Sequence, residues 1–376
     1  MKKVLISTHS LKIGGIEKAL LNLIYALLST KQYEITLCLE KKEGEYLEFL
    51  PPAVKVITYE ASNMGIGAIR KTINLNKQLA FKKEYENKFD VSICYATYSN
   101  PCSFVARTAS ENAILWVHND YLEFYDGDVI KYKRFYNELK AEEFKKIVFV
   151  SEKDRKVFVS LFPHLLQKLV RCNNLLDFND VRRKATEPQN ELVRGNVPTF
   201  ITVCRMDEKQ KQISRIIEAT RRLCQEGYKF RVALLGDGPD LEQFKEHSQN
   251  LPNIHFFGSK LNPYQYMVQA NALLMSSQYE GYPVVWLEAL TLGLPIVTTD
   301  VSDARSDIEG KYGIVGENSD TGVLTAMREF LQHGYRMQPF SPETYNRNVL
   351  NTLAAILSNE APKIDASETK NENLNV

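Results

Sequence analysis

The 376-residue sequence has few cysteines and no long apolar run. Its six cysteines are scattered, and no two are spaced as a C-x-x-C pair. This pattern excludes a disulfide framework or zinc site and indicates buried thiols in a reducing compartment. No stretch approaches the ~20 apolar residues that cross a bilayer, and the early run Val4–Ile6 is too short for a secretory signal. We therefore expect a cytoplasmic protein, at most peripheral at the inner face of the cell membrane.

Charge of one sign and metal-ligand clusters are lacking as well. The formal net charge is +1, which gives no whole-molecule attraction to nucleic acid, and we expect no nucleic-acid partner. No His, Cys or Asp cluster has the spacing typical of a metal site, so we expect no metal and no other cofactor. Asp126 and Asp128 imitate an Asp-x-Asp metal motif. They stand in an irregular polar stretch, however, and are expected to form a solvated loop.

The charge is distributed unevenly along the chain. Residues 1–195 hold 30 Lys and Arg against 24 Asp and Glu, and the remainder holds 17 against 22. This asymmetry indicates that the first half meets something anionic. Within it, residues 66–88 combine apolar positions at helical spacing with a set of basic side chains: Arg70, Lys71, Lys77, Lys82 and Lys83. Such a stretch is either a basic amphipathic helix on an anionic membrane or a surface helix with a solvated charged face.

Short β-branched runs alternate with longer stretches of helical period, which predicts parallel βαβ units. The expected strands are Val4–Ser7, Ile35–Leu39, Val54–Thr58, Val91–Tyr95, Ile114–Val117, Ile147–Val150, Phe200–Cys204, Arg231–Leu235, Ile254–Phe257, Ala272–Met275 and Ile296–Thr298. A polar stretch interrupts the alternation, which restarts at residue 199. We expect two doubly wound Rossmann-like domains at 1–185 and 198–345 with a linker at 186–197. A C-terminal helix at 346–360 and a disordered tail at 361–376 follow.

Polar or small residues follow most of the predicted strands, and His9, His118, Ser151, Arg205, Gly236 and Asp300 stand at those positions. In open parallel sheets, ligands bind beyond the carboxyl ends of the strands. Both predicted domains therefore have a functional rim, and a cleft between the two rims is the expected site.

The segment from Glu280 to Leu290 follows a predicted strand and opens a helix. Gly281 before the helix, and Pro283 at its first position, leave free N–H groups and a positive dipole end for a diphosphate. Glu288 lies four residues after Val284, about one turn (~5.4 Å) behind that end. This is roughly the offset from a diphosphate to ribose hydroxyls. Glu280 is expected on the opposite side, where a sugar would lie.

A basic loop follows the first strand of the second half. Arg205 ends that strand, and Lys209 and Lys211 come within six residues. A fixed Arg and a nearby Lys can clamp a diphosphate and neutralise the charge of a leaving nucleotide. Gly236 begins a Gly-x-Gly turn, and backbone groups near Gly258 are expected to read the base.

Two features of the first half face the same cleft. Gly14 and Gly15 precede Glu17 at the start of a helix, and two glycines allow a ligand to approach the backbone closely. His118 ends a predicted strand, where its ring can hydrogen-bond a sugar hydroxyl.

With Glu-x7-Glu enclosing the tetrapeptide E-G-Y-P, which includes Tyr282, the chain resembles the retaining glycosyltransferases of family GT4. These enzymes have the GT-B fold. The resemblance extends from Val4 to about Gly316. In that family the first Glu contacts the donor sugar and the second the ribose, which implies those roles for Glu280 and Glu288. The family has a similar Arg followed by Lys, a similar Gly-Gly-x-Glu loop and a His matching His118. The chain departs at Cys204 and by one extra loop residue, so Lys209 competes with Lys211; alignment from the following helix favours Lys211.

The resemblance implies a metal-independent retaining enzyme. It would move a hexose-type sugar from a nucleotide-diphosphate sugar, UDP-linked rather than GDP-linked, to a glycan or lipid-linked acceptor of polysaccharide biosynthesis. One alternative is a non-catalytic glycosyltransferase-like binding or chaperone subunit. Another is a nicotinamide oxidoreductase, which would require a complete G-x-G-x-x-G after a strand; neither half has one.

Overall fold

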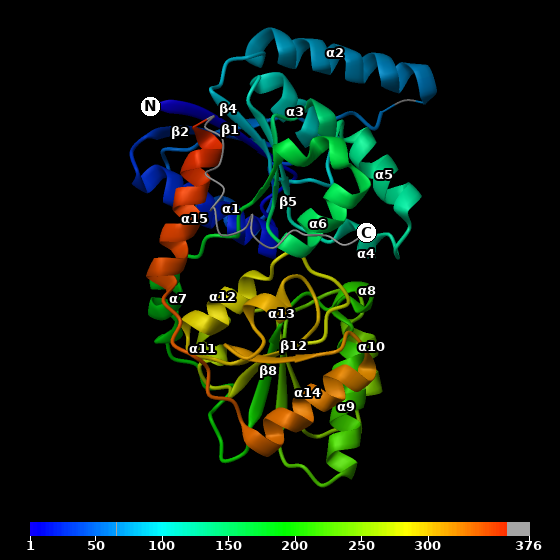
Figure 1. The fold of residues 1–376 in the computed structure, drawn as a ribbon, viewed down its shortest axis with the longest axis vertical. Helices are drawn as coiled ribbons and strands as arrows, with labels where there is room; N and C mark the ends of the chain where they lie inside the picture. Colours follow the sequence, from blue (N-terminus) through cyan, green and yellow to red (C-terminus); the bar gives the residue numbers. More distant parts are fainter. Residues whose placement is uncertain (65, 359–376) are drawn as a thin grey trace, which may run out of the picture.

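Two parallel β-sheets, each covered by helices on both faces, form two domains stacked along the long axis of the molecule (Figure 1). The computed structural model describes residues 1–64 and 66–358, and the predicted disordered tail lies outside them. The expected α/β architecture with two doubly wound Rossmann-like domains is confirmed.

The first domain holds a seven-stranded sheet of order β3-β2-β1-β4-β5-β6-β7. Its strands are β1 (Lys2–Thr8), β2 (Tyr33–Leu39), β3 (Lys55–Thr58), β4 (Val91–Cys94), β5 (Ala113–Val117), β6 (Lys146–Phe149) and β7 (Leu169–Arg171). Its helices are α1 (Gly15–Ser29), α2 (Gly67–Tyr85), α3 (Asn100–Ala109), α4 (Tyr121–Phe124), α5 (Val129–Glu138) and α6 (Glu152–Leu161), with 3-10 turns η1 (Glu45–Phe49), η2 (Ala141–Glu143) and η3 (Pro163–Lys168); α7 (Phe178–Ala185) follows β7.

The second domain holds a six-stranded sheet of order β10-β9-β8-β11-β12-β13. Its strands are β8 (Thr199–Val203), β9 (Arg231–Leu235), β10 (Ile254–Gly258), β11 (Ala272–Met275), β12 (Ile296–Thr299) and β13 (Gly313–Gly316). The helices are α8 (Glu208–Lys211), α9 (Ile213–Gln225), α10 (Leu241–His247), α11 (Tyr264–Met267), α12 (Val284–Thr291), α13 (Ala304–Asp307), α14 (Asp320–His333) and α15 (Pro342–Leu357).

Each sheet reverses its strand order once, between β1 and β4 in the first and between β8 and β11 in the second. Ligands of doubly wound sheets bind at such reversal points, beyond the carboxyl ends of the strands. In the first sheet His9 follows β1, and in the second Arg205 and Ser276 follow β8 and β11. The topology therefore places the predicted rims at the reversal points.

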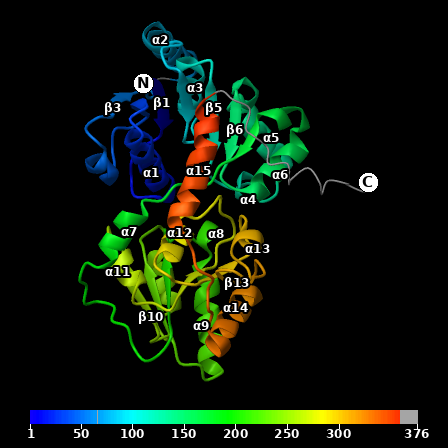
Figure 2. The ribbon, with the colours of Figure 1, turned by 60° about the vertical axis from the view of Figure 1, so that its left-hand side comes forward.

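Helix α15 returns from the second domain to the first and packs along it (Figures 1 and 2). Its apolar side chains, among them Leu353 and Ile356, join the core that also contains strands of the first sheet. Lys146 Nζ donates to the carbonyls of Ala355 and Ile356 at 3.1 and 2.8 Å. Ammonium groups at a helix C-terminus satisfy its free carbonyls and its negative dipole end, so these contacts fix the returning helix.

The boundary between the two domains lies earlier in the chain than predicted. Helix α7, which we expected in the first domain, packs against α11 and α12 of the second. The expected linker 186–197 contains no helix or strand, and Gln189 and Arg194 hydrogen-bond Gln265 and Gln269 of the second domain. The chain therefore passes from the first domain to the second at residues 172–177, between β7 and α7.

Candidate active site

Helix α12 carries the second predicted glutamate into the interior. Glu288 is 7% exposed, and its Oε1 accepts a hydrogen bond from the Tyr264 hydroxyl at 2.8 Å. Burial raises the pKa of Glu288, and the Tyr264 bond with the charges of Lys18 and Lys184 partly offsets that rise. A buried carboxylate requires a specific partner. Here the polar partners come from α11 on its own domain and from α1 across the interface.

The first predicted glutamate forms a shielded ion pair. Lys211 Nζ lies 2.5 Å from Glu280 Oε1, and the two side chains are 16% and 10% exposed. Ser277 Oγ donates to the same carboxylate oxygen at 2.8 Å. Among the residues that the structure describes, no side chain caps the N-terminus of α12. An ammonium, a carboxylate and free helix N–H groups therefore meet in one short segment.

The two lysines of the basic loop point to different places. Lys209 Nζ donates to the backbone carbonyl of Phe124 at 3.1 Å and lies 5.2 Å from the centre of the Phe124 ring. It also lies 3.7 Å from Asp126 Oδ2. It thus bridges to the first domain, whereas Lys211 contacts Glu280. The structure gives Lys211 the position beside the glutamate, and Lys209 an interdomain contact.

Arg205 lies on the exposed loop that follows β8. Its side chain is 61% exposed and pairs with Asp207 at 2.8 Å. Burial raises the pKa of half-buried Glu17, and the charges of His9 and Arg205 partly offset that rise. Arg205 therefore acts electrostatically on the predicted acceptor-side loop, since Glu17 belongs to α1.

The glycine pair before α1 is held by that glutamate. A Cβ placed on Gly14 would lie 2.3 Å from Glu17 Oε2, whereas one on Gly15 would meet nothing within 4 Å. The Glu17 carboxylate therefore folds over Gly14, and the space beside Gly15 is open. This leaves room for the close backbone approach that the sequence predicted.

His118 lies in an aromatic environment between the domains. Its ring is stacked parallel to that of Trp116, with 6.2 Å between the ring centroids. The centroid of the Tyr95 ring lies 4.1 Å from that of His118. Burial lowers the pKa of His118 to about 3, so the imidazole is neutral at physiological pH. Its buried Nε2 has no hydrogen-bond partner among the described residues. A buried polar atom of this kind calls for a ligand or water.

The loop of Glu280 packs directly on the backbone of that histidine. A Cβ placed on Gly281 would lie 2.0 Å from the carbonyl oxygen of His118. This is far inside any real contact, and both atoms are fixed by backbone. Gly281 is therefore required by the approach of the two domains, in addition to the role predicted for it at the helix N-terminus.

The remaining predicted glycines have separate explanations. Gly236 has φ +141°, and its Cβ would lie 1.8 Å from the carbonyl oxygen of Cys204, so a tight turn against β8 requires this glycine. Gly258 has φ +70° with open space around it, and its carbonyl accepts from Gly236 N–H at 2.9 Å. The two turns therefore lie side by side.

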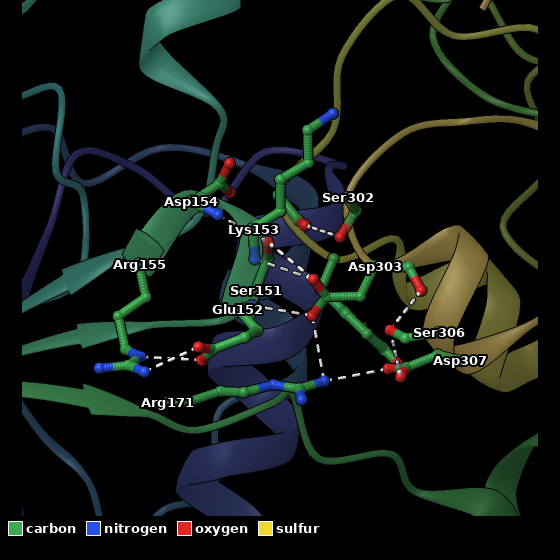
Figure 3. Close-up of polar contacts among 12 residues, drawn as sticks. Ser151, Glu152, Lys153, Asp154, Arg155, Arg171, Ser302, Asp303, Ser306 and Asp307 are labelled. Atoms are coloured by element: carbon green, nitrogen blue, oxygen red, sulfur yellow. Dashed lines mark hydrogen bonds and ion pairs between the residues drawn. The ribbon is translucent and has the colours of Figure 1, made fainter. Parts of the chain in front are cut away.

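A polar cluster joins the two domains behind this loop (Figure 3). Asp303 accepts from the backbone N–H groups of Glu152 and Lys153 at 2.8 and 2.9 Å, so a carboxylate of the second domain sits at the N-terminus of α6. The positive dipole end of a helix favours such an anion. Arg171 pairs with both Asp303 and Asp307 at 3.0 Å, which neutralises the two acids at the interface.

The same cluster supports the Glu280 loop. The Tyr282 hydroxyl donates to Asp307 at 3.1 Å, and the Tyr282 carbonyl accepts from Asn174 at 3.1 Å. Ser302 Oγ donates to the carbonyl of Gly281. Residues of both domains thus hold the segment that places Glu280 beside Lys211.

Asp126 and Asp128 lie in the polar loop between α4 and α5, where a solvated loop was expected. Asp128 caps α5 by accepting from Ile130 and Lys131 N–H at 3.0 Å, and Asp126 occupies a turn with φ +55°. Within residues 1–64 and 66–358, no three His, Cys, Asp or Glu side chains gather in a way that could hold a metal ion.

Sequence reasoning missed the partners that hold the predicted residues, notably Tyr264, Ser277 and Asp303. Ser277 stands three residues before Glu280, so its spacing was available as a signal. Tyr264 lies 24 positions from Glu288, and Asp303 contacts residues about 150 positions away. Neither contact has a local sequence signal.

The burial of Glu288 gives a test that separates stability from binding. Because burial raises its pKa, the charged carboxylate costs folding free energy above its unfolded pKa, and Glu288→Gln removes that cost. We expect the Gln variant to melt higher at pH 8 by ~2 °C. The difference should disappear near pH 4, below the unfolded pKa, where both side chains are neutral. Thermal melts across this range measure it.

The matched control is Glu226→Gln, which breaks an exposed pair with Arg328. The pKa of Glu226 is lowered by that hydrogen bond, so its replacement should not stabilise the protein at pH 8. A Glu288→Gln variant that melts lower at pH 8 than the native protein would show that the charged carboxylate is favourably compensated in the fold.

Comparison with known proteins finds a family match over most of the second domain. Residues 183–347 match the family model described as Glycosyl transferases group 1. An uncharacterized glycosyltransferase of Methanocaldococcus jannaschii is 26% identical over 230 residues, which cover 54% of this chain and 55% of that protein. The lipopolysaccharide 1,6-galactosyltransferase of Escherichia coli is 25% identical over 257 residues, 66% of either chain. The matches thus span about half to two thirds of these relatives.

Solved structures share the fold over nearly the whole chain. The Anabaena protein HepE, in complex with UDP and glucose, superposes with a TM-score of 0.73 at 15% identity, covering 94% of this chain and 100% of that one. TarM of S. aureus, in complex with fondaparinux, α-GlcNAc-glycerol and UDP, gives 0.69 at 12% identity over 95% and 100%. The expected GT-B fold and the resemblance to group 1 glycosyltransferases of the GT4 type are confirmed.

Proposed function

We propose that this protein is a retaining glycosyltransferase, because residues 183–347 match the group 1 glycosyl transferases and the described residues have the GT-B fold. It transfers a hexose-type sugar from a nucleotide-diphosphate sugar to a glycan or lipid-linked acceptor. The observation that carries the proposal is the shielded Lys211–Glu280 pair beside the uncapped start of α12, with Glu288 on the same helix.

The nucleotide binds the second domain in this proposal. The free N–H groups at the start of α12 and the ammonium of Lys211 hold the diphosphate. Arg205, exposed and paired with the neighbouring Asp207 and Gln210, turns onto the phosphates as charge develops on the leaving group. Glu288 accepts hydrogen bonds from the ribose hydroxyls while it keeps the hydrogen bond from the Tyr264 hydroxyl.

The transferred sugar lies between Glu280 and His118. A neutral imidazole can accept or donate a hydrogen bond to a sugar hydroxyl, and His118 has an unpaired, buried Nε2. Glu280 orients the sugar while paired with Lys211, so its carboxylate carries no uncompensated charge. No covalent intermediate with the protein is proposed. Retention would then follow from attack on the face that the leaving group departs from.

The donor is proposed to be UDP-linked and its binding metal-independent. The HepE and TarM structures contain UDP, which supports UDP over GDP, and two cationic side chains supply the charge that Mg²⁺ would otherwise contribute. We expect UDP to bind with equal affinity in the presence and absence of EDTA, and more tightly than GDP. Isothermal calorimetry measures both.

Two results of that titration would count against the proposal. Binding that needs Mg²⁺ or Mn²⁺ would contradict the cationic clamp. If neither nucleotide bound, a non-catalytic binding or chaperone subunit would become the better interpretation, and binding of NAD alone would favour an oxidoreductase.

A peripheral contact with an anionic membrane at the inner cell surface is proposed for α2. The helix lies at the end of the first domain remote from the second (Figures 1 and 2), and of its residues only Phe81 is buried. Ile69, Leu75 and Leu79 are 55–60% exposed. Exposed apolar side chains beside lysines are typical of helices that lie on anionic lipid. Within the described part of the chain, no helix could span a bilayer.

We expect the protein to co-sediment with vesicles of phosphatidylcholine and phosphatidylglycerol but not with phosphatidylcholine alone. Replacing Lys82 and Lys83 by Glu should reduce the bound fraction severalfold, at ~1 kcal/mol per lysine near the surface. Lys245→Glu, on α10 of the other domain, is the control and should bind as the native protein does. Equal sedimentation with both vesicle types would remove the membrane contact.

A further inference from the structure

Three loops at the reversal point of the first sheet bring a histidine, a glutamate and a serine together. His9 follows β1, Glu40 follows β2 and Ser99 caps α3 after β4. His9 Nδ1 lies 2.9 Å from Glu40 Oε2, and Ser99 Oγ donates to that same oxygen at 2.7 Å. None of these residues has a role in the donor site described above.

The contact with Glu40 fixes the orientation and the tautomer of the His9 imidazole. Glu40 is 15% exposed and His9 32%, so the carboxylate is shielded while part of the ring reaches solvent. A carboxylate that accepts from Nδ1–H sets the tautomer and leaves Nε2 as a hydrogen-bond acceptor. Within the described residues, Nε2 of His9 makes no hydrogen bond. The ring therefore presents a free acceptor atom of fixed orientation.

The frame around this group is rigid. The loops after β1 and β2 are joined by backbone bonds from Lys41 N–H to His9 and from Leu11 N–H to Glu43, at 2.8 and 2.9 Å. Gly44, with φ +118°, approaches so closely that a Cβ there would lie 2.1 Å from Leu11. Binding groups whose orientation is fixed in advance lose little entropy on binding.

The group lies at the edge of the first sheet where ligands of doubly wound folds bind, beyond the carboxyl ends of β1 and β2. Tyr98, 45% exposed, holds its ring 6.1 Å from that of His9. An aromatic face beside hydrogen-bonding groups is suited to a sugar ring, whose C–H face is apolar and whose hydroxyls are polar.

We propose that His9, Glu40 and Tyr98 form the acceptor subsite, and that it takes a neutral sugar unit as the end of the acceptor. His9 Nε2 accepts a hydrogen bond from an acceptor hydroxyl, the Tyr98 ring packs on the sugar face, and Glu40 is a positioning residue for the imidazole. The nearby carboxylates of Glu17 and Glu40 disfavour an anionic terminal unit such as a phosphate. This inference rests on the proposed glycosyltransferase function.

Saturation-transfer NMR on the UDP-saturated protein tests the subsite with methyl β-glucoside, methyl β-galactoside and methyl α-mannoside as neutral probes and glycerol 3-phosphate as the anionic probe. We expect at least one methyl glycoside to bind and glycerol 3-phosphate not to. His9→Ala and Glu40→Gln should weaken the glycoside about tenfold, the effect of losing one directed hydrogen bond. His9→Gln, which keeps an acceptor atom, should fall between.

His164→Ala is the matched control, because His164 forms a histidine–glutamate pair with Glu142 of the same 2.9 Å length at an exposed position. Calorimetry with UDP should give the same affinity for every variant, so a loss of nucleotide binding reports on the donor site and not on this subsite. Tighter binding of glycerol 3-phosphate, failure of all three glycosides, or native glycoside binding by His9→Ala would each overturn the assignment.

Discussion

Arg205→Ala is expected to lower kcat on the order of 100-fold while leaving the melting temperature unchanged. Lost electrostatic stabilisers of a leaving group typically cost this much, and the guanidinium is 61% exposed and pairs with Asp207, whose side chain is 21% exposed. Exposed pairs of this kind contribute little to folding. Arg328→Ala is the matched control, because it breaks an exposed pair with Glu226 far from the cleft, and it should keep the native kcat.

The glutamates separate in the same steady-state experiment. In the proposed site Glu280 lies beside the transferred sugar, so Glu280→Gln should lower kcat strongly. Glu288 is proposed to bind the ribose, which changes little during transfer, so its Gln variant should raise the donor KM by about tenfold and affect kcat less. Full kcat in Glu280→Gln with loss in Glu288→Gln would reverse the two roles. Full activity in all three variants would place the chemistry outside this cleft.

The sequence predicted the sheets well because strands of this fold are continuous apolar runs. Each of the eleven predicted strands overlaps an observed one. The two missed strands are the edge strands β7 (Leu169–Arg171), with three residues, and β13 (Gly313–Gly316), with glycine at both ends. Neither is long or apolar enough to give a periodic signal. Their pairing with β6 and β12 defines them as strands.

The C-terminal helix shows a signal that was present but not read. We predicted 346–360, and the structure has α15 at Pro342–Leu357 with Ser341 as its cap. Ser followed by Pro is a standard helix start. That the helix packs on the first domain depends on contacts with residues such as Lys146, about 210 positions away. Such contacts leave no local pattern.

The candidate site divides in the same way. The sequence predicted Glu280 and Glu288 from their spacing and Lys211 from the family resemblance; the structure has Glu280 before α12, Glu288 within it, and Lys211 paired with Glu280. The spacing could not show that Gly281 touches the carbonyl of His118 or that Lys209 bridges to Phe124. Those facts depend on how closely the two domains approach.

The close contact between the two domains at Gly281 leads to the second prediction with a large effect. Gly281→Ala should disrupt the closure of the domains. The new methyl group would lie 2.0 Å from the His118 carbonyl oxygen, and neither atom can yield without backbone movement. Ser302 and Asn174 hold the adjoining carbonyls from opposite domains, so the loop cannot retreat without losing those bonds. We expect the domains to separate and kcat to fall on the order of 100-fold, as misplacement by about 1 Å does in other enzymes.

UDP affinity should change little in this variant, because the residues proposed to bind the diphosphate and the ribose all lie in the second domain. Small-angle scattering should show a larger radius of gyration than the native protein, and calorimetry should show intact UDP binding. Gly195→Ala is the control, since its Cβ would meet only the end of the flexible Arg231 side chain, at 3.0 Å. If Gly281→Ala retained both native scattering and native kcat, the closed contact with His118 would not be required for transfer. Loss of UDP binding would instead show that the glycine serves the phosphate site directly.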